Sequence, residues 1–238
     1  MQDETMTHSG AFAAAAAAPA GAPPMKLYTY FRSSAAYRVR IALNLKGLTY
    51  EPVPVHLVRD GGEQHKPDYL GLNPAGLVPA LEEHGQVITQ SLAIIEYVDE
   101  TRPAPPLLPN DPLGRARVRA IAQSIACDIH PINNLRVLRY LKQEVGVSDD
   151  AKDAWYRHWV ETGLAAVEAL LADDPRTGRY CHGDAPGLAD CCLVPQVFNA
   201  LRFRCRTDHL PTVMRIAAQC ESLDAFRRAA PGNQPDAE

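Results

Sequence analysis

Residues 26–47 read KLYTYFRSSAAYRVRIALNLKG and hold one strand-like run and one helix-like run joined by a polar turn. The β-forming residues of 26–30 predict a strand, and the apolar residues of 34–46 recur at helical spacing until a glycine stops the pattern. The turn between them contains Ser33 and Ser34, and serine is a strong helix N-cap. The stretch therefore predicts a β-α unit whose helix begins at this serine pair.

The chain that follows extends this unit into a small sheet with helices. Residues 50–55 look extended, and their two prolines confine them to a sheet edge. A loop and a helix follow, and then residues 78–82 and 86–89 form a hairpin pattern around His84-Gly85. Ser91 is expected to cap a helix that runs to about Thr101. The predicted order is β-α-β-α-β-β-α, a small α/β layer.

A proline-rich stretch separates this block from a second one. Five prolines fall within residues 102–112, so neither a strand nor a helix is expected there, and Asp111-Pro112 suits the start of the next helix. Residues 112–230 are almost purely helical in pattern, with Pro131 and Pro195 expected to kink or end helices. The second block is thus predicted to be an all-α bundle with its own core.

Residues 1–24 differ from both blocks. They contain no Lys or Arg, carry two acidic residues near the start, and are otherwise largely Ala, Pro and Gly. Such a segment cannot bury enough apolar surface to offset its ordering entropy, so we expect a disordered extension. The missing positive charge argues against a secretory signal, which stays open as an alternative. A start at Met25 would leave 214 residues.

Composition excludes several classes of protein. The chain has 238 residues, 46% of them hydrophobic and 22% charged, which is typical of a globular protein. A net charge of −4 argues against a nucleic-acid binder, and no apolar run is long enough to predict a membrane span. The six cysteines include no C-x-x-C pair, so we expect no metal site and no disulfide framework, but reduced thiols in the cytoplasm. Cys191 and Cys192 are expected to be packing residues.

Taken together, the two blocks and their motifs resemble zeta-class glutathione transferases. The resemblance runs from about Lys26 to Asp236. Each motif is weak alone, and their order and spacing make the signal specific. The motifs are Phe31–Leu43 (FRSSAAYRVRIAL), Leu72-Asn73-Pro74, Val78–Leu81 (VPAL), Gln90–Tyr97 (QSLAIIEY), His130–Leu135 (HPINNL) and Gly183–Asp190 (GDAPGLAD).

This resemblance implies an α+β fold with two domains. Residues 25–102 would form a thioredoxin-like βαβαββα domain that binds glutathione, residues 103–111 a linker, and residues 112–238 an all-helical substrate-binding domain. The family also implies a homodimer. In the Gly183–Asp190 motif Gly187 stands where Ser or Thr is usual as N-cap, and this site concerns folding.

The family pattern assigns the glutathione thiol to the serine pair. A helix N-terminus favours an anion, and a serine hydroxyl there can donate to a thiolate, with Ser33 as primary donor and Ser34 in support. The plainer interpretation is a helix cap with no further role. Many zeta enzymes carry Cys at the next position, where this chain has Ala35.

Other parts of glutathione would meet motifs farther along the chain. A cis Val78–Pro79 bond would present the Val78 backbone to the cysteinyl part, and Gln90-Ser91 would receive the γ-glutamyl carboxylate. Gln64 would contact the glycyl arm. His130 and Asn134, with the adjacent Asn133, match a segment that contacts glutathione and substrate, although zeta enzymes often have Gln in place of this histidine.

Arginine is unusually frequent, since 19 of the 24 basic residues are Arg. Most are expected on the surface, and the run Arg115-Arg117-Arg119 is predicted to form a solvated helix face. Arg32, Arg136 and Arg202 lie in or beside the matched motifs, so we predict that they bind the carboxylates of a dianionic keto acid.

The activity implied is a glutathione-dependent cis–trans isomerisation of a maleyl-keto acid. A thiolate adds to the cis double bond, rotation follows, and elimination returns the thiolate and the trans product. Maleylacetoacetate is the narrow first choice as substrate, and maleylpyruvate is the close alternative. A transferase that conjugates small electrophiles such as α-halo acids, and a non-catalytic glutathione-binding protein, are the two other hypotheses.

Overall fold

The computed structural model describes residues 25–238, so the expectation for residues 1–24 lies outside the described part. Its first half is a four-stranded sheet of order β2-β1-β3-β4, in which β1 and β2 are parallel and the other neighbours antiparallel. β2 is the proline-containing edge strand that the sequence predicts. The strands are β1 (Lys26–Thr29), β2 (Glu51–Pro54), β3 (Ala80–Glu83) and β4 (Gln86–Thr89).

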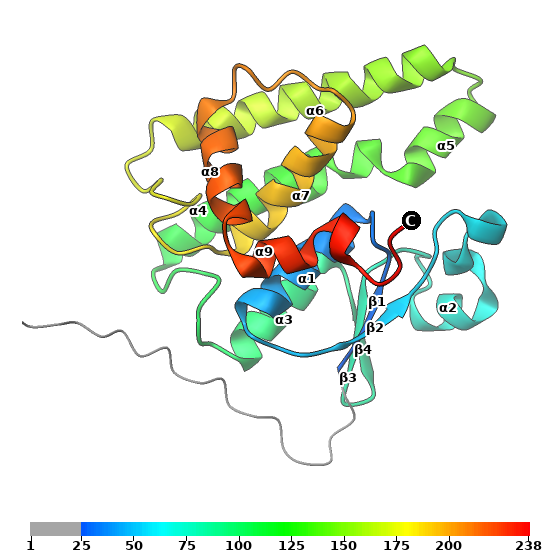
Figure 1. Cartoon of the computed structure of the whole chain (residues 1–238), viewed down its shortest axis with the longest axis horizontal. Coiled ribbons are helices and arrows are strands. Elements are labelled where there is room, and N and C mark those ends of the chain that lie inside the picture. Colours follow the sequence, from blue (N-terminus) through cyan, green and yellow to red (C-terminus); the bar gives the residue numbers. More distant parts are fainter. Residues whose placement is uncertain (1–24) are drawn as a thin grey trace, which may run out of the picture.

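Helices flank this sheet, and the rest of the chain is helical (Figure 1). α1 (Ser34–Leu45) and α3 (Ser91–Thr101) lie between the sheet and the helical half, and α2 (Pro67–Leu72) lies beyond the sheet. The helical half comprises α4 (Pro112–Gln123), α5 (Leu135–Gln143), α6 (Asp149–Ala172), α7 (Leu188–Arg202), α8 (Pro211–Glu221) and α9 (Asp224–Ala229). This is the predicted thioredoxin-like plus all-helical architecture.

Helix α4 does not end cleanly. It passes into a π-helical segment, Ser124–Ile129, and then into a 3₁₀ turn at Pro131–Asn133. Pro131 therefore ends the helical run as predicted, because it cannot donate the backbone hydrogen bond that would continue it. The break directs His130 and Asn134 toward the sheet half.

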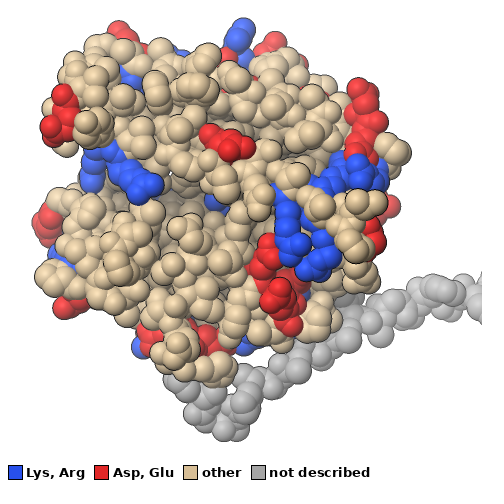
Figure 2. Space-filling view, turned by 180° about the vertical axis from the view of Figure 1, so that it is seen from behind, with Lys and Arg blue, Asp and Glu red and all other residues tan. Residues whose placement is uncertain are grey.

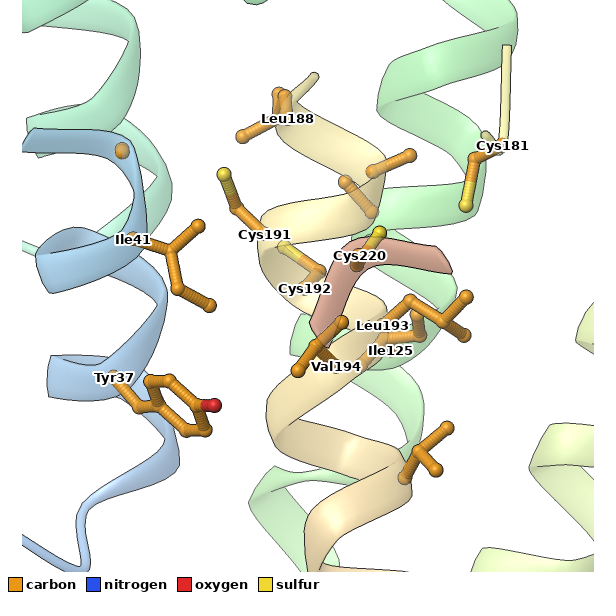
Figure 3. Close-up of a cluster of buried hydrophobic side chains, with 14 of the residues drawn as sticks. Tyr37, Ile41, Ile125, Cys181, Leu188, Cys191, Cys192, Leu193, Val194 and Cys220 are labelled. Atoms are coloured by element: carbon orange, nitrogen blue, oxygen red, sulfur yellow. The ribbon is translucent and has the colours of Figure 1, made fainter. Parts of the chain in front are cut away.

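The core joins the two halves along α1 and α7 (Figure 3). Tyr37 and Ile41 of α1 face Cys191 and Val194 of α7, and all four are at most 3% exposed. Cys191 and Cys192 thus pack in the core, as predicted. Burial raises the pKa of both thiols.

The linker region is held by buried polar contacts. Lys46 is fully buried, and its ammonium lies 2.6 Å from Asp99 and donates to the carbonyls of Arg102 and Pro105. Gly187 packs so closely on the linker that a Cβ would lie 2.7 Å from the Leu107 carbonyl oxygen, which explains glycine where Ser or Thr is usual. The division at residues 103–111 remains our proposal for the domain boundary.

Two helix-end predictions were wrong. Gln90, not Ser91, is the N-cap of α3; Ser91 is the first helical residue, and its hydroxyl accepts a hydrogen bond from buried Arg38 at 3.2 Å. Of the prediction that Pro195 would kink or end a helix, the ending is wrong: α7 continues through Pro195, because this helix is buried along most of its length and its packing offsets the roughly 3 kcal/mol cost of an internal proline.

The arginine run on α4 is also not simply a solvated face. The Arg117 side chain is 8% exposed, pairs with Asp174 at 3.0 Å and donates to the Cys181 carbonyl. Arg119 pairs with Glu96 of α3 at 2.6 Å. On the face shown in Figure 2, positive and negative side chains lie side by side in small groups. No helix within residues 25–238 is long and apolar enough to cross a membrane.

Candidate active site between the sheet half and the helical half

A cleft of about 480 Å³ lies where the two halves meet. Its walls come from the β1–α1 turn, the loop after β2, the segment before β3, the break after α4, α5 and the end of α7. Nine of the predicted site residues line it: Arg32, Ser33, Ser34, Gln64, Val78, His130, Asn134, Arg136 and Arg202.

Three predicted residues do not line this cleft. Pro79 lies behind Val78, and the Val78–Pro79 peptide bond is cis, as the resemblance implies. Gln90 and Ser91 stand at the start of α3, outside the lining set. Gln90 has a φ of 70°, and Ser91 is linked to the cleft indirectly: it accepts from Arg38, which also donates to His130 of the lining set.

The serine pair forms the N-terminus of α1. Ser33 is the N-cap, and its hydroxyl oxygen accepts from the Ala36 amide at 3.2 Å. The same hydroxyl retains its own proton for donation. The amides of Ser34 and Ala35 are the first of the helix and have no intrahelical acceptor. This end of the cleft therefore offers a hydroxyl donor and a positive helix terminus to an anion.

The charge lining the cleft is mostly positive. Among the lining residues that the structure describes are four arginines and one carboxylate, Glu144. Within residues 25–238 the guanidinium groups of Arg32, Arg136 and Arg202 have no recorded hydrogen bond or ion pair, whereas Arg117 and Arg119 are paired. The unpaired guanidinium groups are available to a ligand, and guanidinium matches carboxylate geometry.

His130 is tied to the first half by a buried arginine. Arg38, 2% exposed, lies with Nη2 2.9 Å from His130 Nδ1. Arginine can only donate, so Nδ1 accepts. The other ring nitrogen, Nε2, lies 3.2 Å from Asn134 Nδ2, while Asn134 Oδ1 caps α5 by accepting from the Arg136 amide. Burial, with the charges of Arg38 and Arg136, lowers the pKa of His130 to about 3.

Two buried acceptors at the cleft lack partners. Gln64 Oε1 and Asn133 Oδ1 have no hydrogen bond within the described residues, although both side chains are at most 7% exposed. A buried acceptor without a donor is costly. A ligand with amide or ammonium N–H groups would satisfy both atoms, and a glutathione-like peptide has such groups.

Comparisons with known proteins agree with this geometry. Residues 23–100 match the glutathione S-transferase N-terminal domain, and residues 149–230 match the C-terminal domain. A probable maleylacetoacetate isomerase of Vibrio cholerae is 54% identical over 211 residues, 89% of this chain and 97% of the relative. The chain belongs to the glutathione S-transferase family.

Solved structures narrow the class of glutathione S-transferase. A maleylpyruvate isomerase described as a bacterial zeta-class enzyme is 52% identical, with a TM-score of 0.87 over 90% of this chain and all of the other. A maleylacetoacetate isomerase from Methylobacterium extorquens AM1, with malonate and GSH bound, is 46% identical, with a TM-score of 0.86 over 90% and 99%. The first of these structures confirms the resemblance to zeta-class enzymes.

Sequence reasoning missed several cleft residues of this glutathione S-transferase. Asn199 of α7 donates to the Ser34 hydroxyl at 2.5 Å, and Arg139 of α5 donates to the Leu57 carbonyl at 3.1 Å, bridging the two halves. Tyr30 and Gln196 also line the cleft. Tyr30 stands directly before the Phe31–Leu43 motif. The other residues are of common types and are brought to the site by helix packing, so no local pattern could have revealed them.

The lowered pKa of His130 predicts a pH effect on stability. As the pH falls from about 6.5 toward 3, an unfolded His130 takes up a proton that the folded residue does not, so this residue contributes stability at neutral pH that is lost on acidification. His130→Gln should therefore have a shallower loss of unfolding free energy over this range. Urea titrations of both chains at several pH values measure it, and parallel curves would contradict the assignment.

Proposed function

We propose that this glutathione S-transferase is a glutathione-dependent isomerase of a maleyl-keto acid, with maleylacetoacetate as the preferred substrate. The observation that carries the proposal is one cleft that holds a serine-capped helix N-terminus beside three unpaired arginines. The helix N-terminus suits a thiolate, and the three arginines suit a substrate with two carboxylates. The names of the relatives support the same reaction.

Each residue has a proposed part in binding the coenzyme. Ser33 donates its hydroxyl proton to the thiolate, with Ser34 in support, and the free amides of α1 add positive potential. Gln64, Val78 and Asn134 hold the peptide, for which Gln64 offers its unpartnered acceptor. Pro79, Gln90, Ser91 and His130 complete the proposed set. When bound, glutathione supplies a thiolate that adds reversibly to the double bond and so permits rotation.

The arginines are proposed to hold the substrate and to stabilise developing charge. Arg32 lies beside the serine pair, whereas Arg136 and Arg202 stand on the helical half. Guanidinium groups from both halves would fix the two carboxylates in register, so that the reacting bond lies against the N-terminus of α1. Negative charge that builds on the keto group would meet a cleft that is already positive.

The test is a side-by-side assay with maleylacetoacetate and maleylpyruvate, with and without glutathione. We expect isomerisation of at least one acid only when the thiol is present, faster turnover of maleylacetoacetate, and full recovery of glutathione. S-methyl glutathione, whose thiol is blocked, is the matched control and should not support turnover. Faster turnover of maleylpyruvate would make maleylpyruvate the preferred substrate. Consumption of glutathione would indicate a conjugating transferase, and absence of isomerisation would refute the proposal.

We also propose a cytoplasmic homodimer. All six cysteines are free thiols, which suits a reducing compartment. The homodimer is implied by the family, and light scattering of the purified chain tests it.

A further inference from the structure

Residues 231–238 return from the helical half to the sheet half. After α9 the chain makes a 3₁₀ turn at Pro231–Asn233 and then crosses the start of α1 (Figure 1). Asp236 Oδ2 there accepts a hydrogen bond from the Phe31 amide at 2.9 Å, although the two residues are 205 positions apart. Phe31 belongs to the turn that leads into the serine pair.

The same turn is held from its other side by Arg40. This side chain is fully buried, and it forms no ion pair with a carboxylate of residues 25–238. Its guanidinium donates to the carbonyls of Tyr30 and Phe31 at 3.3 and 3.0 Å. Burial lowers the pKa of Arg40 to about 10, with Tyr50 and Asp236 opposing the shift, so the group stays charged at neutral pH.

These contacts are linked to Ser33 by the backbone of the turn. The Ser33 amide donates to the Tyr30 carbonyl at 2.9 Å, so one hydrogen bond joins the two ends of the turn from Tyr30 to Ser33. Arg40 holds carbonyl groups of this turn, and Asp236 holds the Phe31 N–H. Loss of the contact with Asp236 would leave one side of the turn free, and with it the N-terminus of α1.

The same C-terminal segment also contacts the loop after β2, which forms another wall of the cleft. The Glu238 carboxylate lies 2.8 Å from Arg59 and 3.3 Å from His56 Nε2. His56 Nδ1 accepts from the amides of Val58 and Arg59, so the neutral ring carries its proton on Nε2, which lies near Glu238 but makes no hydrogen bond within residues 25–238. These contacts are more exposed than the Asp236 contact, so we expect the smaller effect from them.

We propose that Asp236 is a positioning residue of the glutathione site, which acts through the Phe31 amide on the turn that presents Ser33 and the N-terminus of α1. The inference rests on the proposed function, because it assigns that turn to glutathione. Asp236 is not among the residues that line the cleft.

The test compares Asp236→Ala with Asp236→Asn. Alanine removes the acceptor, whereas asparagine retains an oxygen that can accept from Phe31. We expect Asp236→Ala to weaken glutathione binding in titration calorimetry by roughly tenfold, the scale of one lost hydrogen bond to a charged group. The glutathione affinity of Asp236→Asn should be closer to that of the natural chain than the affinity of Asp236→Ala is. Amide hydrogen exchange should accelerate at Phe31 in the alanine variant.

Asp224→Ala is the matched control, since Asp224 on neighbouring α9 pairs only with exposed arginines. It should leave both readouts unchanged. Unaltered glutathione affinity in Asp236→Ala would overturn the proposal, and so would an equal rise of exchange throughout the chain, which would indicate a general folding role. If the natural chain binds no glutathione, the proposed function fails, while exchange at Phe31 still tests the contact.

Discussion

Ser33→Ala is expected to lower kcat/KM for glutathione-dependent isomerisation by about 10²- to 10³-fold, the range for loss of one donor to an anion in an active site. The serine lines the cleft at the positive end of α1, and its proton is not used by the helix cap. Its loss should also raise the pKa of bound glutathione, because the thiolate loses a hydrogen bond that favours the ionised form. The ultraviolet absorbance of the thiolate against pH measures this shift.

A second substitution can distinguish the role of Ser33 as helix N-cap from its proposed role as donor to the thiolate. Alanine costs about 1 kcal/mol as an N-cap, whereas glycine costs only a few tenths. Ser33→Gly should therefore retain most of the stability and still lose the activity. Ser34→Ala is the comparison on the neighbouring hydroxyl, which is 8% exposed and already accepts from Asn199. If Ser33→Ala kept its turnover and Ser34→Ala lost it, the primary donor would be Ser34.

Asp190→Ala is expected to lower the free energy of unfolding by about 2–5 kcal/mol, because two buried donors lose their acceptor at roughly 1–3 kcal/mol each. The carboxylate is 1% exposed and accepts from the amides of Cys181 and Gly187 at 2.9 and 2.8 Å. Removing it leaves two buried N–H groups without partners. Burial raises the pKa of this carboxyl, and the amide donors oppose that shift.

Urea denaturation followed by tryptophan fluorescence measures this loss. Asp184→Ala is the matched control, because Asp184 accepts from the Arg179 amide in the same loop but is exposed. Its effect should stay below about 1 kcal/mol. A loss at Asp190 no greater than that at Asp184 would show that the two amides find other acceptors. The thiol of Cys220, whose sulfur lies 3.9 Å from Asp190 Oδ1, is a poor substitute, since sulfur is a weak acceptor.

Much of the fold could be predicted from local patterns. The β1–α1 unit, the edge strand with its prolines, the hairpin and the Asp111 cap all follow from short-range preferences, and the structure shows each. The errors at Ser91 and Pro195 arose where packing overrides preference: a buried arginine occupies the Ser91 hydroxyl, and the buried surroundings of α7 stabilise an internal proline.

Only part of the candidate site could be predicted from local sequence patterns. The serine pair, Gln64 and Val78 stand in matched motifs close to secondary-structure ends, and all line the cleft. All arginines carry the same charge, so only the matched motifs set the three unpaired arginines apart from the others in the sequence. Their lack of partners is a property of the folded surface, because each possible partner comes from another element.

The sequence by itself determined the order of elements in the first block, the all-helical nature of the second, the serine cap of α1 and membership of this family, because these depend on short-range spacing and on ordered motifs. Only the tertiary structure decided that Asn199 reaches Ser34, 165 positions away, and that Asp236 reaches Phe31. Such contacts depend on where separate elements come together. That arrangement follows from the burial of α1 and α7 against each other, a cooperative result that no single stretch of sequence specifies.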